Sequence, residues 1–227
     1  MRKRIFYTEL AYVAGLLGVA VGTALTASAD FGVSMVVAPA YLVYLKLSEY
    51  LPFFTFGMAE YGLQALLLLL MMAIVRRFKF SYLFSFVTAV LYGLILDGTM
   101  TLAGYIPMDI LPIRVICYAA GIVCTSAGVA FFFQTYISPE VYELFVKEVS
   151  GHFNRDINKF KTCYDCISCA VGIALSFAFF GLWHFEGVKL GTVVCALVNG
   201  FLIGNFTKLY KRIWSFEDGL KLRKYFE

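Results

Sequence analysis

Charged side chains are scarce in this chain. Only 15% of its 227 residues are Asp, Glu, Lys or Arg, whereas 61% are hydrophobic. About a quarter of the residues of a typical soluble domain are charged, so this composition excludes a soluble globular domain. The net charge of +4 does not indicate a nucleic-acid-binding face, because the basic residues gather at the ends of apolar runs.

Residues that build catalytic and metal centres are few or poorly spaced. The chain has two histidines, no His-Glu-x-x-His pattern and no Gly-rich nucleotide-binding loop. Cys163, Cys166 and Cys169 have the spacing of metal and cluster sites. They fall inside an apolar helical stretch, however, which favours a role as small packing residues. We therefore expect no catalytic site, no metal and no cofactor, and the chain is not expected to be an enzyme.

Long apolar runs, in contrast, recur along the whole chain. A run of about 20 apolar residues can cross a bilayer as an α-helix. The first run follows a basic start and lacks a clear small-residue cleavage site, which favours a first span over a signal peptide. The sequence predicts an all-α, polytopic membrane protein that forms one membrane domain. The six expected transmembrane helices are 8–29, 57–75, 81–97, 113–135, 162–182 and 189–207.

Two further helical segments are not expected to span. The stretch 138–161 is the longest polar run, and its first part is an amphipathic helix with four charges within nine residues. Such charges are costly in hydrocarbon. The segment 33–50 is apolar enough to suggest a seventh span, but seven spans would place the basic C-terminal tail, 208–227, outside. Both segments are therefore predicted to be non-spanning, either re-entrant or flat at the interface.

The distribution of basic residues predicts the orientation. With six spans and both termini in the cytoplasm, sixteen of the nineteen Lys and Arg residues fall on the inside. Only Lys46, Arg114 and Lys189 fall on the outside. Because cytoplasmic loops carry an excess of Lys and Arg, this count favours a protein of the cell (cytoplasmic) membrane with both termini and the 138–161 segment in the cytoplasm.

An internal repeat relates the two halves of the chain. At an offset of 106, the glycines 15, 18 and 22 fall on Gly121, Cys124 and Gly128, and near that offset Glu60 falls on Asp165. Each half consists of a span, a short helix and two more spans. Since three spans is an odd number, the second half enters the membrane from the opposite side. The sequence thus predicts an inverted-topology repeat with halves 8–97 and 113–207, a build that many transporters share.

Several polar residues lie where a central site would form. Glu60 and Gln64 share one helix face, and Asp165 is the counterpart of Glu60 in the second half. An acidic residue in a span indicates function unless it is solvated near an interface or paired with a neighbour such as Arg114 or Lys161. The candidate substrate-binding residues are Glu60, Gln64, Asp165, Ser34, Ser138, Glu140 and Asn199.

The other candidates have specific alternatives. Ser34 and Ser138 precede the two short helices, whose free N–H groups would suit an anionic or polar group if the helices dip inward. Asn199 either lines a cavity or bonds to another helix. Asp97 ends its predicted span, which favours a cap on the loop side.

Short motifs in both halves resemble a known group. Residues 29–34, ADFGVS, match A-D-x-G-x-S, and residues 187–192, GVKLGT, match G-V-x-x-G-T. Ser138-Pro139-Glu140, then Lys161 and Tyr164-Asp165, resemble the matching part of the second half. Over roughly 15–207 the chain resembles the YczE/YyaS/YitT-like group of bacterial integral membrane proteins. The resemblance implies a multi-pass bacterial membrane protein and no settled activity.

These features favour transport of a small polar or charged molecule by a permease with a central site between the two halves. Glu60 and Asp165 would hold a cation or a coupling proton. The alternatives are a membrane substrate-binding subunit of a larger transport complex and a non-transporting scaffold or regulatory membrane protein. The expected partners are the lipid bilayer, a small-molecule or ion substrate, and either a second copy in a homodimer or a partner membrane subunit. No nucleic acid is expected.

Overall fold

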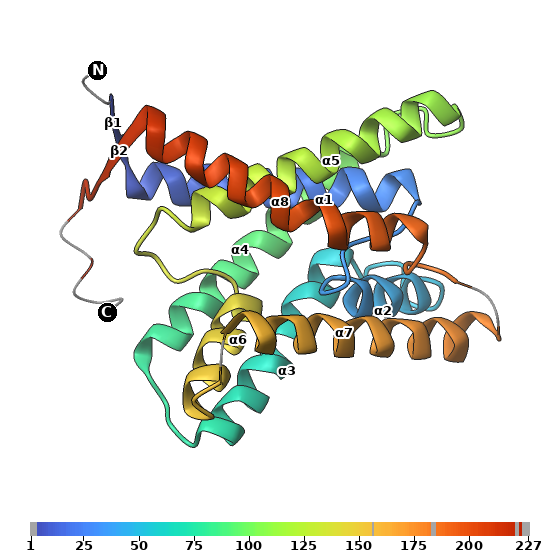
Figure 1. The fold of residues 1–227 in the computed structure, drawn as a ribbon. Helices are drawn as coiled ribbons and strands as arrows, with labels where there is room; N and C mark the ends of the chain where they lie inside the picture. The colour runs from blue at the N-terminus through green and yellow to red at the C-terminus, as the bar shows by residue number, and fades with distance from the viewer. Residues whose placement is uncertain (1–3, 156, 183–184, 221–222, 224–227) are drawn as a thin grey trace.

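The computed structural model describes residues 4–155, 157–182, 185–220 and 223. Within them the elements, in chain order, are β1 (Arg4–Tyr7), α1 (Thr8–Ala29), α2 (Ala38–Ser48), α3 (Phe56–Val75), α4 (Phe80–Ala103), α5 (Leu111–Phe132), α6 (Val141–His152), α7 (Ile157–Phe180), α8 (Leu190–Ile213) and β2 (Trp214–Glu217). In Figure 1, α1, α5 and α8 form one layer, and α2, α3, α6 and α7 form another. Helix α4 crosses from one layer to the other.

The six long helices confirm the predicted number of apolar spans. Among the described residues, α1, α3, α4, α5, α7 and α8 contain six stretches that are long and apolar enough to cross a membrane. The chain is therefore a polytopic membrane protein.

Two spans, α4 and α8, extend furthest beyond their predicted ends; α8 continues from the predicted 207 to Ile213. The sequence predicts a span that ends at Asp97, but α4 continues to Ala103. The Asp97 carboxylate instead accepts hydrogen bonds from the Thr55 hydroxyl and the Gly57 N–H, both at 2.7 Å. Asp97 is thus a cap, as expected, but it caps the start of α3 and not its own loop.

Glycines bring α1 and α5 into backbone contact at the centre of one layer. A Cβ on Gly128 would lie 2.7 Å from the Val19 nitrogen and 2.8 Å from the Gly15 oxygen. At the other end of the contact, a Cβ on Gly121 would lie 2.8 Å from the Gly22 oxygen. The two helices are antiparallel, since residue numbers rise in α1 as they fall in α5. Small residues allow this close approach, which favours helix association in a membrane.

The other helices pack in pairs that match between the two halves of the chain. Helix α1 contacts α4 as α5 contacts α8; α3 contacts α6 as α2 contacts α7; and α2 contacts α3 as α6 contacts α7. Two pairs depart from this match. Helix α6 contacts α4, whereas α2 and α8 make at most a marginal contact among the described residues. Helices α3 and α4 pack closely, whereas α7 and α8 make at most a marginal contact among the described residues.

The two short helices cannot cross a membrane. Helix α2 has 11 residues and α6 has 12. At about 1.5 Å per residue, each covers little more than half of a hydrocarbon core about 30 Å thick. Helix α6 runs alongside α3 and packs its apolar face on α3 and α4. Figure 1 places α2 and α6 toward opposite ends of the long helices, with α6 toward the end where the termini lie. The buried residues through which α3, α4 and α6 pack together are Leu68, Met71, Val75, Tyr82, Ala89, Val141, Leu144, Phe145 and Val149.

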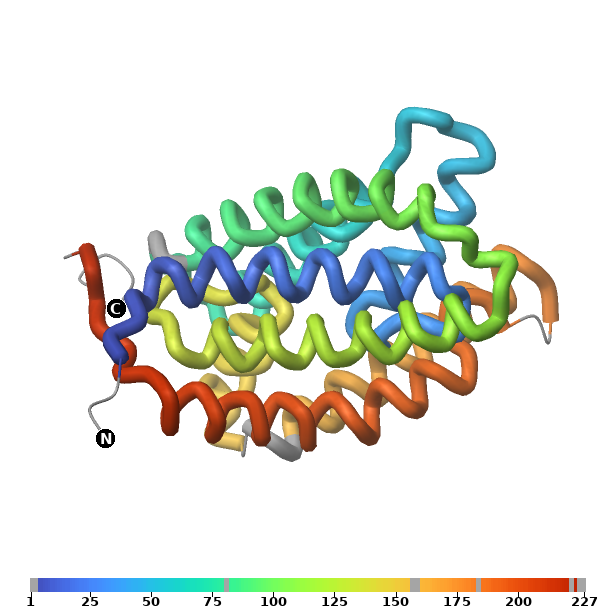
Figure 2. Tube along the Cα trace, turned by 90° about the horizontal axis from the view of Figure 1, so that it is seen from above, coloured from blue at the N-terminus to red at the C-terminus, as the bar shows by residue number. Residues whose placement is uncertain are grey.

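The two ends of the chain meet in a sheet that the sequence analysis did not predict. Strands β1 and β2 pair in parallel, with Arg4 opposite Trp214 and Tyr7 opposite Glu217. Both ends therefore lie together at one end of the bundle, here called the terminal end (Figure 2). Aromatic rings cover the joint, including Phe131 and Tyr210 at 4.1 Å between centroids. In the predicted tail 208–227, α8 continues to Ile213 and β2 follows it to Glu217; residues 221–222 and 224–227 lie outside the described residues.

Candidate functional site

Polar contacts fix the start of α3, the helix that carries Glu60 and Gln64. The Thr55 hydroxyl oxygen accepts a hydrogen bond of 3.2 Å from the Met58 N–H, as expected of an N-cap residue. Beside it, a Cβ on Gly93 of α4 would lie 2.9 Å from the Gly57 oxygen, so the two backbones touch. Together with the Asp97 cap, these contacts hold α3 in one position against α4. They thereby fix the direction in which its polar face points.

Glu60 is completely enclosed. Its exposed fraction is 0%. The Tyr142 hydroxyl on α6 donates a hydrogen bond of 2.8 Å to its Oε2. Its other oxygen, Oε1, is also buried and has no hydrogen-bond partner among the described residues. Because buried polar atoms are nearly always paired in folded proteins, an unpaired carboxyl oxygen calls for a functional explanation.

Gln64 connects the same face of α3 to the start of α6. Its Oε1 accepts a hydrogen bond of 3.1 Å from the Val141 N–H, the first residue of that helix. Its Nε2 donates to Oε2 of Glu140 at 3.4 Å. One amide side chain therefore satisfies an N–H at the helix start and holds a carboxyl group that lies there. The structure brings together three of the predicted site residues, Glu60, Gln64 and Glu140.

The electrostatic surroundings of Glu140 are negative. Its exposed fraction is 6%. Burial, Glu143 and Glu60 together raise the pKa of Glu140 well above its ordinary value. Burial also raises the pKa of Glu143, and Lys161 opposes that effect. Among the described residues, no Lys or Arg forms an ion pair with Glu60 or Glu140. We call the set Glu60, Gln64, Glu140 and Tyr142 the α3–α6 site.

Ser138 lies next to this site and faces α4. Its carbonyl oxygen accepts a hydrogen bond of 3.1 Å from the Thr88 hydroxyl. Tyr12 on α1 shares a further hydrogen bond of 2.8 Å with Thr88. Polar groups thus extend from α1 through α4 to the segment that precedes α6. Ser138 itself is buried, at 8% exposed, and takes part in the local framework of the site.

Asp165 lies on α7 and is separate from Glu60. Its side chain is 25% exposed, and Lys161, one turn earlier, lies 3.9 Å from its Oδ1. That distance is too long for a hydrogen bond, and Oδ1 has no hydrogen-bond partner among the described residues. Asp165 interacts electrostatically with Glu143 and Tyr164, which lie beside the α3–α6 site. The pairing with Lys161 is the structural alternative that the sequence left open.

The structure gives Ser34 and Asn199 places away from the α3–α6 site. Ser34 starts the turn before α2, where its carbonyl accepts hydrogen bonds from the N–H groups of Val37 and Ala38. The Oδ1 of Asn199 on α8 accepts a hydrogen bond of 3.0 Å from Ser126 on α5. Asn199 therefore joins two helices, which was one of its two predicted roles.

The two motifs that suggested a family resemblance contact each other. The Val33 N–H donates to the Gly187 oxygen, and the Gly191 N–H donates to the Phe31 oxygen, each at 2.9 Å. Gly32 has a φ of 110° and leaves no room for a side chain next to Thr192. Ion pairs from Asp30 to Lys189 at 2.6 Å and to Arg114 at 3.6 Å surround the joint. These motifs hold the two halves together and do not contribute to the α3–α6 site.

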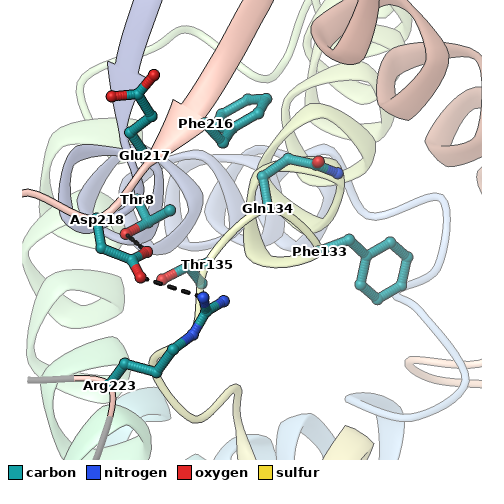
Figure 3. Close-up of a pocket in the computed structure, with 8 residues that line it drawn as sticks. All are labelled: Thr8, Phe133, Gln134, Thr135, Phe216, Glu217, Asp218 and Arg223. Carbon is teal, nitrogen blue, oxygen red and sulfur yellow. Dashed lines mark hydrogen bonds and ion pairs between the residues drawn. The ribbon is translucent and has the colours of Figure 1, made fainter.

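An open pocket of about 600 Å³ lies at the terminal end of the molecule. Its lining residues are Thr8, Phe133, Gln134, Thr135, Phe216, Glu217, Asp218 and Arg223, shown in Figure 3. Asp218 accepts a hydrogen bond of 3.0 Å from Thr8 and forms an ion pair of 3.2 Å with Arg223. The sequence analysis missed this pocket because it joins residues from the two ends of the chain. It also missed Tyr142, because one tyrosine in an amphipathic helix does not stand out in the sequence.

Comparison with known proteins places the chain in a family. Residues 6–208 match the model of a family of unknown function, DUF6198. The chain belongs to this family. The family description does not mention the YczE/YyaS/YitT-like group. The resemblance to that group therefore stays a prediction. No curated protein and no solved structure matches this DUF6198 chain significantly.

Proposed function

We propose that this polytopic membrane protein is a permease for a small polar or charged molecule. The observation that carries the proposal is the enclosed carboxyl group of Glu60, which projects from a spanning helix and receives its hydrogen bond from Tyr142 on a short helix of the other half. A charged or protonated group at such a depth is costly and marks substrate and ion pathways in membrane proteins. The proposal assigns the chain no catalytic step.

The packing supports an inverted repeat. At the offset of 106, the contact of Gly15 with Gly128 corresponds to the contact of Gly121 with Gly22, and both are present. The matched pairs α3–α6 and α2–α7 each join a long helix of one half to the short helix of the other. In this arrangement a half-turn about an axis in the membrane plane superposes the half 8–97 on the half 113–207, and the site lies between the two halves.

The course of α6 supports a re-entrant helix. It begins beside Gln64, near the middle of α3. Near its other end, Glu148 contacts Lys79 and Tyr82, at the start of α4. The start of α6 is therefore the inner end of the dip. Its Val141 N–H is already used by Gln64, and Glu140 adds negative charge, so this start favours a cation or proton over an anion.

The proposed location is the cytoplasmic membrane with the terminal end in the cytoplasm. Support comes from the basic residues, since sixteen of the nineteen Lys and Arg residues fall on that side of a six-span topology. The open pocket between α1, α5 and the chain's end would then face the cytoplasm.

Reconstitution of the protein alone in liposomes tests the proposal. A panel of amino acids, amines and carboxylates is first screened for thermal stabilisation of the purified protein, and every hit is then tested for radiolabelled uptake. We expect saturable uptake of at least one solute by the unsubstituted protein. Glu60→Gln should abolish it, and Glu148→Gln, which changes a partly buried side chain bonded to Lys79 and Tyr82 outside the α3–α6 site, should retain it.

The same experiment separates the alternatives. A solute that stabilises the protein and is never taken up would favour a substrate-binding subunit that needs a partner for transport. A protein that neither binds nor transports any solute of the panel would favour a scaffold or regulatory role and would count against the permease.

A further inference from the structure

We infer that Glu60 and Glu140 form a pair that binds one exchangeable proton, and that this proton is the coupling ion of the site. The inference rests on the proposed function in one respect only: coupling requires transport, whereas proton binding does not. In each cycle the pair would take one proton from water on one side of the membrane, share it between the two carboxyl groups, and release it to water on the other side.

The first argument is the geometry of Glu60. Tyr142 donates to Oε2, and Oε1 has no donor among the described residues, although the side chain is 0% exposed. A proton on Oε1 would make the group neutral, and Oε2 would keep its hydrogen bond from Tyr142. An ionised Glu60 would leave a negative oxygen in an enclosed place without any hydrogen bond.

The second argument is the pair itself. Gln64 lies between the two carboxyl groups: its Nε2 donates to Oε2 of Glu140, and it lies one turn from Glu60 on the same face of α3. Glu60 and Glu140 also interact electrostatically. Two buried carboxyl groups that interact in this way favour a single shared negative charge, because each opposes ionisation of the other. The proton therefore belongs to the pair and not to one residue.

Among the described residues, the groups that surround the pair offer no positive charge in direct contact. On α1, Tyr12 interacts with Glu140; on α4, Tyr92 interacts with both carboxyl groups. On α6 the neighbours are Tyr142 and Glu143, and on α7 Tyr164 interacts with Glu60. Lys161, on α7, acts on Glu143 and Asp165. Neutrality at the pair must then come from a bound cation, and a proton is the smallest.

The ligand set also favours a proton over a metal ion. Among the described residues, no three His, Cys, Asp or Glu side chains converge as they do around a metal. A metal ion such as Ca²⁺ takes six to eight oxygen ligands, whereas a proton needs one lone pair. The hydroxyl groups of Tyr12 and Thr88, the second of which donates to the Ser138 carbonyl, add polar groups beside the segment that carries Glu140.

Infrared difference spectroscopy of the purified full-length protein tests the inference. A protonated carboxylic acid has a C=O band that carboxylates lack and that shifts in D₂O. We expect this band at neutral pH in the unsubstituted protein. In Glu60→Gln and in Glu140→Gln, removal of the opposing charge should move its titration to lower pH by at least about one unit. The double variant should lose the part of the band that titrates with the pair, and any part that Glu143 contributes should remain.

Glu148→Gln is the matched control, because Glu148 lies on the same helix and forms an ion pair with Lys79 at 3.0 Å. It should leave both the band and its titration unchanged. Elution as a monodisperse species confirms that each variant folds; if Glu60→Gln does not fold, Glu140→Gln carries the test. A double variant that keeps the band of the unsubstituted protein overturns the inference, as does a site that responds to Na⁺ or K⁺ at fixed pH and not to pH.

Transport is measured separately with a pH-sensitive dye inside proteoliposomes. Solute uptake accompanied by acidification that Glu140→Gln abolishes supports coupling. Uptake without proton movement would show that transport is not coupled to protons, and the proposal of a permease would stand. The expected band without any uptake supports the proton-binding pair and counts against the permease.

Discussion

Tyr142 donates a hydrogen bond of 2.8 Å to Glu60 across 82 residues of chain. Both side chains are buried, and they come from helices of different length and different polarity. The carboxyl group of Glu60 is therefore held by the packing of α6 against α3, and the site exists only when that packing is correct.

Removing the Tyr142 hydroxyl should destabilise the protein. Tyr142→Phe keeps the ring and removes the 2.8 Å hydrogen bond to Oε2 of the buried Glu60. We expect a loss of about 1–3 kcal/mol in the free energy of unfolding, measured by denaturant titration in detergent. Tyr105→Phe, at an 83% exposed position, should have no effect. We expect the double variant Glu60→Gln, Tyr142→Phe to lose less stability than the sum of the two single losses. A loss equal to that sum would show that the two residues are not coupled.

Gly128 should tolerate no side chain. Gly128→Ala places a Cβ against the Gly15 oxygen and the Val19 nitrogen, so α1 and α5 must separate. We expect a loss of about 1–3 kcal/mol, as in other overpacked interiors, seen as a lower midpoint of thermal aggregation. Gly204→Ala on α8 is the control, because nothing lies within 4 Å of its Cβ position. Equal midpoints for the two variants would contradict the close α1–α5 contact.

Glu60 and Asp165 should differ in their effect on transport. Glu60→Gln removes an enclosed charge or proton, whereas Asp165→Asn changes a side chain that is 25% exposed and lies near Lys161. Once a substrate is known, uptake by Glu60→Gln should fall by more than about tenfold, or ~1.4 kcal/mol, and uptake by Asp165→Asn by less. Full uptake by Glu60→Gln would show that Glu60 has only a structural role.

Stability should depend on pH with opposite signs for Glu140, which precedes α6, and Glu148, which lies within it. The pKa of Glu140 lies well above its ordinary 4.5, so the folded state retains a proton that the unfolded chain releases, and stability falls as the pH rises above 4.5. Burial alone would raise the pKa of Glu148, but hydrogen bonds from Lys79 and Tyr82 lower it. The stability that ionised Glu148 contributes is therefore lost as the pH falls below the ordinary pKa of 4.5.

Thermal unfolding from pH 4 to pH 8 separates the two effects. Glu140→Gln should remove part of the decline at high pH, and Glu148→Gln should remove part of the decline at low pH. The same pH profile in Glu140→Gln and in the unsubstituted protein would show that Glu140 is ionised in the folded state.

Cysteine labelling should place the terminal end in the cytoplasm. On a cysteine-free background, Phe78→Cys and Arg155→Cys lie near the α3–α4 loop and the end of α6, where basic residues are frequent. An impermeant thiol reagent should label neither variant in intact cells and both after permeabilisation. Labelling of either one from outside would exclude the six-span orientation.

Sequence reasoning was most successful for elements that depend on local composition. Apolar length alone predicts a spanning helix, and the six long helices follow the predicted runs. The charges of 138–161 similarly indicated a short, non-spanning α6. The end of α4 was wrong because Asp97 is stabilised by Thr55 and Gly57 on another helix, a partner that the local sequence does not show.

For the site, the sequence by itself determined that acidic residues lie in or beside spans, because a carboxyl group among apolar residues is conspicuous whatever the fold. It placed Glu60, Gln64 and Glu140 among the candidates. Only the tertiary structure decided which candidates meet. Glu60 and Glu140 converge because α6 packs along α3, whereas Asp165 and Asn199 belong to other helix contacts. The parallel β1–β2 pair depended on the fold in the same way, since its hydrogen bonds join residues 210 positions apart and form only after the helices have brought both ends together.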